Sequence, residues 1–114
     1  MSMRLLPIAL LFAGLALLAG PIAKAAGAQS QPHRVFIAGD YTAAEYGPER
    51  APRNGWGQQL QGFLDPAHFQ VRNHAMGGRS SRSFIDEGRL EPVVRELRKG
   101  DVLLIQFGHN DAKY

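Results

Sequence analysis

Polar residues capable of chemistry follow three apolar runs of this 114-residue chain. They lie in Gly39-Asp40-Tyr41-Thr42, in Asn73-His74-Ala75-Met76-Gly77-Gly78-Arg79-Ser80, and in Gln106-Phe107-Gly108-His109-Asn110-Asp111. The carboxyl ends of parallel strands meet at one edge of an open α/β sheet, and such sheets keep their ligands there. Acyl transfer needs a nucleophile, a base and hydrogen-bond donors for the developing oxyanion, so a shared edge is where these residue types can act together.

The elements expected to position these stretches alternate between strands and helices. Continuous or alternating apolar runs predict strands at residues 35–38, 69–73 and 101–107. Apolar residues on one face predict a short helix over 56–64, and a second helix follows over about 91–99. Between the first strand and first helix, residues 41–54 contain glycine, proline and charges, which indicates an irregular loop above the sheet.

The segment before the third strand carries helix-start signals. Ser83 is a candidate N-cap, because Asp86 follows it at capping-box spacing. Pro92 fits the first turn of the main helix, and Gly100 ends that helix. The buried stripe is expected to consist of Leu90, Val94 and Leu97.

The element order predicts an α/β fold of three layers, α/β/α, with a parallel flavodoxin-like sheet. In that order the first strand is central, and the third strand pairs with a fourth. The third strand reads Val-Leu-Leu-Ile, which is continuous enough to be covered on both faces. The chain is therefore expected to be truncated after its third strand, leaving residues 102–107 as an open apolar edge.

Residues 1–26 have the order of a signal peptide. Arg4 precedes the apolar run of residues 5–18, and Gly20-Pro21 leads to the small-residue pattern Ala23-Lys24-Ala25. Cleavage after Ala25 and cleavage after Ala28 fit equally, and a membrane anchor is the alternative. We expect residues 27–34 to be a linker, residues 35–114 to form the domain, and the protein to be exported by a bacterium to the periplasm or the extracellular space, with no stable membrane span after cleavage.

Composition and charge limit the other functions. The chain is 45% hydrophobic and 20% charged, as globular proteins are, and it has no cysteine for a disulfide or a thiolate metal site. From Gly27 onward, eleven Lys and Arg residues oppose ten Asp and Glu residues. The net charge of about +1 predicts no basic face for nucleic acid.

The three polar stretches resemble the SGNH (GDSL-type) hydrolases. Within that family, three segments look like the rhamnogalacturonan acetylesterase branch: Thr42-Ala43-Ala44-Glu45-Tyr46-Gly47-Pro48, Gly78-Arg79-Ser80-Ser81-Arg82-Ser83-Phe84 and Gly108-His109-Asn110-Asp111. The resemblance implies an SGNH hydrolase fold and an esterase without metal or organic cofactor. It also implies that acetyl esters on pectic polysaccharide are hydrolysed through a Ser, Asp and His triad.

The resemblance also carries over roles for single residues. Gly78 matches the glycine whose backbone N–H donates to the oxyanion, and Asn110 matches the asparagine whose side-chain amide does the same. The third donor is the N–H of the nucleophile position, which is Tyr41 here. Asp40 matches the aspartate that orients the turn, and His109 matches a structural neighbour of the site.

Two arginines in the second stretch have alternative interpretations. Arg79 and Arg82 can contact an anionic galacturonate backbone, or they can pair locally near the start of a helix. The partner implied in either case is an acetylated polysaccharide or oligosaccharide.

Tyr41 departs from the family pattern, which has serine at that position. A phenol is mostly protonated at neutral pH, and its oxygen lies too far from the backbone to reach the point where the oxyanion donors converge. We expect the ring to fill the acyl pocket instead. The family's Asp-x-x-His segment near the C-terminus is also missing before Tyr114.

Two functional hypotheses follow for this chain. In the first it is the N-terminal part of a secreted carbohydrate O-acetylesterase and has no activity of its own. In the alternative it is a non-catalytic carbohydrate-binding remnant of the same fold, which holds acetylated sugar through Gly78, Arg79, Arg82 and Asn110.

Three other patterns have simpler explanations. Asp65-Pro66-Ala67-His68 has the Asp-x-x-His spacing, but it precedes the second strand and so belongs to the opposite edge, roughly 16 Å from Tyr41. Gly55-Trp56-Gly57 lacks the spacing of a dinucleotide-binding loop. No Asp-x-His is present to begin a metallophosphoesterase site.

Overall fold

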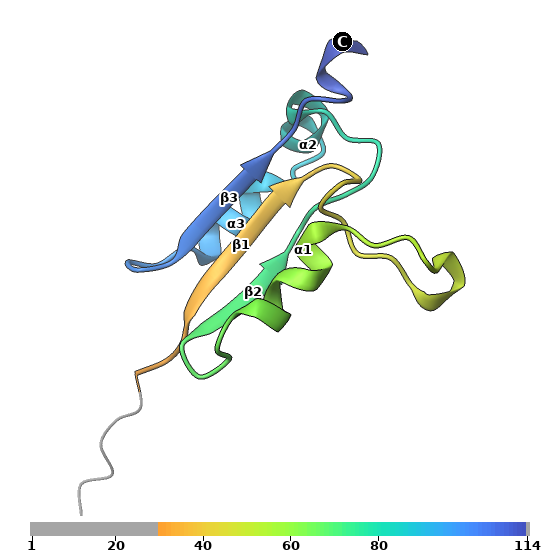
Figure 1. Ribbon diagram of the computed structural model, residues 1–114. Helices are drawn as coiled ribbons and strands as arrows, with labels where there is room; N and C mark the ends of the chain where they lie inside the picture. The colour runs from red at the N-terminus through yellow and green to blue at the C-terminus, as the bar shows by residue number, and fades with distance from the viewer. Residues whose placement is uncertain (1–29, 114) are drawn as a thin grey trace, which may run out of the picture.

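The computed structural model of the chain describes residues 30–113, and within them the strands form one parallel sheet. The strands are β1 (His33–Gly39), β2 (Phe69–Asn73) and β3 (Val102–Gln106), in the order β2-β1-β3 (Figure 1). The predicted parallel α/β sheet with a central first strand is confirmed. The predicted signal peptide, residues 1–26, and the linker residues 27–29 lie outside the described residues.

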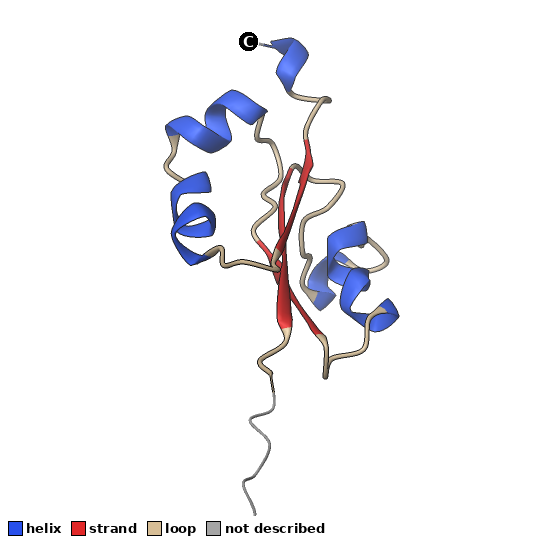
Figure 2. Cartoon of the chain, turned by 90° about the vertical axis from the view of Figure 1, so that its left-hand side faces the viewer, coloured by secondary structure: helices blue, strands red, loops and turns tan. Residues whose placement is uncertain are grey.

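Helices cover both faces of this sheet (Figure 2). On one side lie α1 (Trp56–Gln59) and the 3-10 turn η2 (Leu60–Phe63); on the other lie α2 (Ser81–Asp86) and α3 (Leu90–Glu96). Two further 3-10 turns are η1 (Pro48–Arg50) and η3 (Asp111–Lys113). In this part of the chain no helix is long and apolar enough to cross a membrane.

The core is centred on β1, which is buried on both faces. A Cβ on Gly57 of α1 would lie 3.0 Å from the Cδ1 of Ile37, so α1 packs closely on one face of the strand. Phe84 of α2 lies on the other face, where it lines a small apolar cavity with Ala38. The buried apolar residues are Val35, Phe36, Ile37, Ala38, Ala43, Ala44, Phe84 and Val93.

β1 begins two residues before the predicted strand, so His33 and Arg34 are not linker residues as the sequence predicted. Side-chain contacts extend the strand. Arg34 donates from its backbone N–H to Asp101 Oδ1 at 2.8 Å and from its guanidinium to Asp101 Oδ2 at 2.7 and 3.1 Å. The guanidinium also lies over the Phe36 ring, 5.1 Å from its centroid, which fixes the start of β1 against the core.

The predicted N-cap at Ser83 is wrong, because the helix begins earlier. Ser80 caps α2: its Oγ accepts from the Ser83 N–H at 3.0 Å, and the Ser83 Oγ accepts from the Ser80 N–H at 2.9 Å. Ser83 is thus the third helical residue of a reciprocal capping box. The two serines satisfy each other's backbone donors, which Asp86 cannot do from its place in the helix.

The second predicted helix is shorter than expected and presents a different stripe. α3 ends at Glu96, because Leu97 already has a non-helical backbone with a φ of −56° and a ψ of 132°. The prediction that Gly100 ends the helix is therefore wrong, and Gly100, with a φ of +92°, lies in the turn that follows. Val93 is fully buried, whereas Val94 is 57% exposed, so the predicted stripe is wrong at Val94, while Leu90 and Leu97 are half-buried. Adjacent helical residues point about 100° apart, and the apolar pair Val93-Val94 leaves two orientations open to a sequence argument.

β3 is the edge strand of the described sheet, and the prediction that it is covered on both faces is wrong for these residues. Ile105 is 65% exposed and Val102 is 43% exposed. The prediction of an apolar, open edge at residues 102–107 is therefore confirmed for residues 30–113.

The contact between Arg34 and Asp101 predicts a pH dependence of stability. Hydrogen bonds from Arg34 lower the pKa of Asp101 from 3.8 to about 2. Because the folded state favours the carboxylate, this contribution to stability is present above the unfolded pKa and is lost as the pH falls toward the folded one. We expect Asp101→Asn to lower the urea midpoint at neutral pH and to flatten its decline between pH 3.8 and about 2.

Trp56 fluorescence can report the unfolding in these titrations. Glu91→Gln is the control, because it also removes one carboxylate paired with an arginine, but its side chain is 68% exposed. An Asp101→Asn variant that kept the parent's pH profile would contradict the assignment.

Candidate functional site

Three loops meet at the carboxyl edge of the sheet, each following one strand (Figure 1). Contacts between them are direct. The Met76 N–H, after β2, donates to the carbonyl of Gly39 at the end of β1 at 2.9 Å. Asn110, after β3, donates from its amide to the Arg79 carbonyl at 3.1 Å. The three polar stretches that the sequence analysis singled out are therefore brought together.

The turn after β1 is held by a buried carboxylate. Asp40 is 2% exposed, and its Oδ1 accepts from the Thr42 backbone N–H at 3.0 Å and from the Thr42 hydroxyl at 2.8 Å. Before it, Gly39 has no room for a side chain, since a Cβ there would lie 2.9 Å from the carbonyl oxygen of Gln106. These contacts fix the backbone on either side of Tyr41.

Tyr41 occupies the nucleophile position and makes ring contacts. Its ring meets the His109 ring edge to face, with 5.3 Å between centroids and an interplanar angle of 80°. The Arg53 guanidinium carbon lies 5.9 Å from the centroid of the same ring. Among residues 30–113 no group hydrogen-bonds the Tyr41 hydroxyl, so no base there is placed to take its proton.

The Gly77-Gly78 turn lies directly against Tyr41. A Cβ on Gly77 would be 3.6 Å from the Tyr41 Cβ, which is ordinary van der Waals contact. Gly78 has a φ of +78°, a conformation that glycine adopts without the strain of a side chain. Gly77, the residue before Gly78, is thus the one that contacts Tyr41, and the role of Gly78 as an oxyanion donor stays a prediction.

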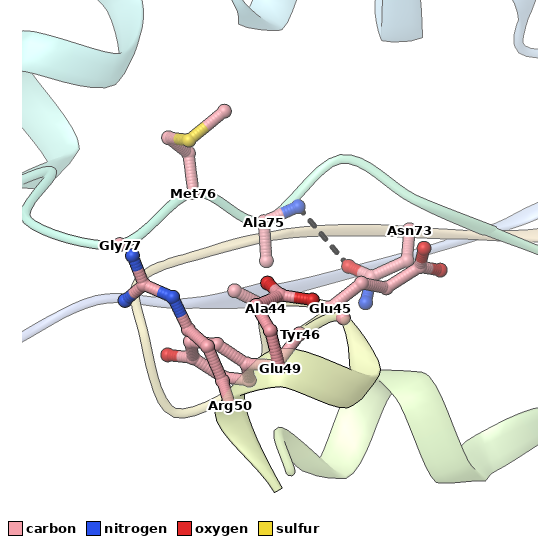
Figure 3. A pocket seen from close by; sticks show the side chains of 10 residues that line it. Ala44, Glu45, Tyr46, Glu49, Arg50, Asn73, Ala75, Met76 and Gly77 are labelled. Atoms are coloured by element: carbon pink, nitrogen blue, oxygen red, sulfur yellow. Dashed lines mark hydrogen bonds between the residues drawn. The ribbon is translucent and has the colours of Figure 1, made fainter. Parts of the chain in front are cut away.

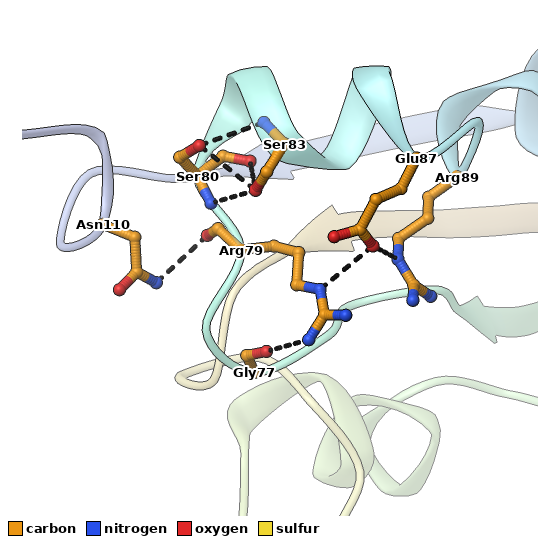
Figure 4. A network of polar contacts seen from close by, with 7 residues as sticks. All are labelled: Gly77, Arg79, Ser80, Ser83, Glu87, Arg89 and Asn110. Atoms are coloured by element: carbon orange, nitrogen blue, oxygen red, sulfur yellow. Dashed lines mark hydrogen bonds and ion pairs between the residues drawn. The ribbon is translucent and has the colours of Figure 1, made fainter. Parts of the chain in front are cut away.

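Asn110 lies at the same edge and is only 5% exposed. Its amide group donates to the backbone carbonyl of Arg79, one residue beyond Gly78 (Figure 4). The Asp111 carboxylate adds a second link, since it accepts from the Ser81 N–H and the Ser81 hydroxyl at 2.6 and 2.7 Å. The loop after β3 is thus tied to the start of α2, and the oxyanion role of Asn110 stays a prediction.

The two arginines proposed for substrate binding differ in their surroundings. Arg79 donates to Glu87 at 3.1 Å and to the Gly77 carbonyl at 3.0 Å, so its guanidinium is held locally (Figure 4). Hydrogen bonds from Arg89, and then from Arg79, hold the pKa of Glu87 below its ordinary value. Arg82 is exposed on α2. A contact of either residue with galacturonate stays a prediction.

A cavity of about 540 Å³ lies beside this edge, between the loop after β1 and the loop after β2 (Figure 3). One of its walls is the segment 41–54, for which the sequence predicted only an irregular loop. The Asn73 side-chain amide donates to the Ala43 carbonyl at 2.8 Å, and the Asn73 Oδ1 accepts from the Ala75 N–H at 3.0 Å. The lining residues are Ala44, Glu45, Tyr46, Gly47, Glu49, Arg50, Asn73, Ala75, Met76 and Gly77.

The cavity's outer wall is also ordered by specific bonds. Gln58 of α1 accepts from the Tyr46 N–H and donates to the Tyr46 carbonyl, both at 3.0 Å. The Tyr46 hydroxyl then donates to the Tyr41 carbonyl at 2.6 Å. The spacing of Tyr46 and Gln58 is a long-range pairing that no local pattern reveals, which is why the sequence analysis missed this wall.

Other candidate groups lie away from this edge. Asp65 and His68 are exposed and 3.8 Å apart, and the His68 carbonyl accepts from the N–H of His33 at the start of β1. Their predicted place at the opposite edge is confirmed. Within the described part of the chain, no group of three or more His, Asp or Glu side chains can hold a metal ion.

A parallel α/β sheet that gathers three polar loops at its carboxyl edge defines an α/β domain with its chemistry at that edge. Comparison with known families makes this specific. The sequence model of the GDSL-like Lipase/Acylhydrolase family matches residues 35–114, and the chain belongs to this family.

Within this family, the chain is similar in sequence to individual rhamnogalacturonan acetylesterases. Over 83 residues the chain is 51% identical to the rhamnogalacturonan acetylesterase RhgT of Bacillus subtilis, covering 73% of this chain and 35% of RhgT. It is 38% identical over 78 residues to a rhamnogalacturonan acetylesterase of Emericella nidulans, covering 68% of this chain and 28% of that enzyme. The chain spans about a third of the length of these relatives.

A solved structure supports the fold. The crystal structure of YxiM from Bacillus subtilis superposes with a TM-score of 0.66 at 37% sequence identity, covering 70% of this chain and 23% of YxiM. The predicted SGNH hydrolase fold and the resemblance to rhamnogalacturonan acetylesterases are confirmed.

The buried Asp40 gives the first prediction for this site. Asp40→Ala leaves both Thr42 donors without their acceptor, and we expect it to lower the free energy of unfolding by about 1–3 kcal/mol. Thr42→Ser is the matched control, because it keeps the backbone N–H and the hydroxyl. Urea unfolding followed by Trp56 fluorescence measures both. Equal stability of the Asp40→Ala variant and its parent would show that the turn does not depend on this carboxylate.

Proposed function

We propose that the chain is a secreted, pectin-directed member of the carbohydrate acetylesterase group that binds acetylated saccharide at the carboxyl edge of its sheet without hydrolysing the ester. The observation that carries this proposal is that the Gly77-Gly78 turn lies against Tyr41, while Asn110 is bonded to Arg79 at the end of the same turn. The framework around the reacting centre is present, and the residue at its centre is changed.

The cavity supports a saccharide ligand. Its volume of about 540 Å³ falls in the range of small-molecule sites, about 300–1,000 Å³. Its wall carries the carboxylates of Glu45 and Glu49 and the guanidinium of Arg50, which suit the hydroxyl groups and the carboxylates of a pectic sugar (Figure 3). The relatives named as rhamnogalacturonan acetylesterases supply the acetylated pectic substrate class.

Tyr41 supports the absence of hydrolysis. Its ring packs on His109, and in residues 30–113 its hydroxyl has no hydrogen-bond partner to activate it. Loss of a nucleophilic serine lowers kcat by about 10⁶ in the subtilisin example. The family resemblance assigns the general base to an Asp-x-x-His segment, and the one such segment in these 114 residues, Asp65 to His68, lies at the opposite edge of the sheet.

Export is proposed from the N-terminal sequence. Residues 1–26 have the positive, apolar and small-residue regions of a signal peptide, which directs a bacterial protein to the periplasm or beyond. Extracellular pectic polysaccharide is accessible to a protein delivered there.

The ordered cavity wall also favours this binding role, because Tyr46 is bonded to both Gln58 and Tyr41. Since Arg79 is held by Glu87, this role draws on the cavity and Arg50 rather than on Arg79 alone.

Hydrolysis can be tested with p-nitrophenyl acetate. We expect no turnover above background from the chain, and none from Tyr41→Ser, because a serine without a base remains a protonated, weak nucleophile. Tyr41→Phe is the matched control that keeps the ring and removes the hydroxyl. Turnover by the chain that disappears in Tyr41→Phe would identify Tyr41 as a working nucleophile and contradict the proposal.

Binding can be tested separately with an acetylated rhamnogalacturonan oligosaccharide. We expect Arg50→Ala to weaken its affinity about tenfold, because a charged hydrogen-bond donor is removed from the cavity. Arg95→Ala is the control: Arg95 is also an exposed cation, but it pairs with Glu91 on α3. Calorimetric titration gives the dissociation constants, and equal affinity in the parent and Arg50→Ala would rule out the cavity as the binding site.

A further inference from the structure

A second pocket lies at the amino edge of the sheet, opposite the candidate active site. It has a volume of about 260 Å³ and sits where β1 begins, at the lower end of the sheet in Figure 1. Its wall combines the chain entering β1, the β2 strand and the turn between α3 and β3. The lining residues are Gln31, Pro32, His33, Arg34, Gln70, Arg72, Arg98, Lys99 and Asp101.

The charges of this basic pocket do not balance. Asp101, the one carboxylate among its lining residues, is bound by two nitrogens of the Arg34 guanidinium, at 2.7 and 3.1 Å. The Glu96 carboxylate, just outside the lining, lies 3.7 Å from the same guanidinium. Arg72 has only a neutral partner, since it donates to the amide oxygen of Gln70 at 3.4 Å. Within residues 30–113, the side chains of Arg98 and Lys99 have no ion-pair or hydrogen-bond partner. Three cations are therefore left without an acid.

Hydrogen bonds of the backbone hold the turn that carries Arg98 and Lys99. Asp101 accepts from the Arg98 backbone N–H at 2.9 Å, so the turn that bears Arg98 and Lys99 is bonded to the carboxylate that also holds β1. Gly100 of the same turn packs against His33 at the start of β1, since a Cβ on Gly100 would lie 2.6 Å from the His33 ring.

The strand register places the third cation, Arg72, on the same face of the sheet as Arg34. Arg72 is paired with Phe36 of β1, and Gln70 is paired with Arg34. Paired residues of adjacent strands point to the same face of a sheet, so Arg72 and Arg34 share the face that α3 covers. α3 ends at Glu96, and the Glu96 carbonyl accepts from the Arg34 guanidinium. The pocket thus opens where α3 stops.

We propose that this basic pocket is a second binding site for oxyanions, and that its ligand is the carboxylates of an acidic saccharide chain. Two arginines and a lysine offer the charge, and the planar guanidinium matches a carboxylate in two parallel hydrogen bonds. The saccharide part rests on the proposed function, because galacturonate is the acidic sugar in the polysaccharide for which the relatives are named.

The two sites lie at opposite ends of the strands, so one short sugar cannot reach both. A five-residue strand separates its edges by roughly 16 Å. The basic pocket therefore holds the polymer at a distance from the acetyl group bound at the carboxyl edge. Since the cations of the basic pocket are exposed, we expect its affinity for the acidic saccharide to decrease with rising salt concentration.

The test uses unacetylated oligogalacturonate and the full chain at low ionic strength. We expect Arg72→Ala and Arg98→Ala each to weaken binding about tenfold in calorimetric titrations, since each removes a charged donor. Arg95→Ala removes one exposed cation that is already paired with Glu91, and we expect it to change the affinity less than twofold. Unfolding midpoints equal to the parent's show that the variants are folded.

A second titration distinguishes a saccharide ligand from free phosphate. A third comparison distinguishes failure of this inference from failure of the proposed function. Inorganic phosphate is titrated in place of oligogalacturonate; phosphate binding without oligogalacturonate binding overturns the saccharide assignment. Oligogalacturonate affinity unchanged in both arginine variants overturns the basic pocket alone. The acetylated oligosaccharide of the preceding section reports on the cavity through Arg50→Ala, so the proposed function can fail or hold independently.

Discussion

Burial of β1 on both faces is the constraint on which the rest of this structure depends. Residues 35–40 are all less than a tenth exposed, and a strand covered in this way needs a paired strand on each side and a helical layer on each face. Asp40, directly after the strand, brings a carboxylate into the interior, and a buried carboxylate is tolerated only with hydrogen-bond partners. Thr42 supplies them, so packing of the core and geometry of the Tyr41 turn are set by the same strand.

The fold accepts Tyr41 because the framework of the site is made from the backbone. The Tyr41 carbonyl accepts a hydrogen bond from the Tyr46 hydroxyl, and the Asp40 carboxylate accepts one from the Thr42 N–H. Neither bond involves the side chain at position 41. The ring itself points toward His109 and Arg53 and finds favourable contacts there. Structural stability and reactivity are therefore separable at this position, as function resides in particular side chains grafted on a fold.

Elements with strong apolar patterns could be predicted, and those decided by long-range contacts could not. The second strand was predicted to the residue, and β1 was correctly expected to be central, because their apolar runs are bounded by turn residues. The Ser80 cap was missed because Ser83 offers the same side chain three positions later. The first cavity depends on Gln58 bonding across to Tyr46, twelve residues away, which no periodicity encodes.

The basic pocket shows the same limit for electrostatics. A net charge of about +1 over the chain from Gly27 onward indicates no basic face, yet folding brings Arg72, Arg98 and Lys99 from separate segments into one pocket. In a parallel sheet every connection that leaves a strand lies at the carboxyl edge, and every connection that enters one lies at the amino edge. Arg98 and Lys99 precede β3, so they lie at the amino edge, whereas the charged residues Glu45, Glu49 and Arg50 follow β1 and lie at the carboxyl edge. Residues at the two edges share no contact, so the effects of substitutions there on the binding free energy add. For the same reason, tyrosine in place of serine at position 41 leaves the basic pocket unchanged.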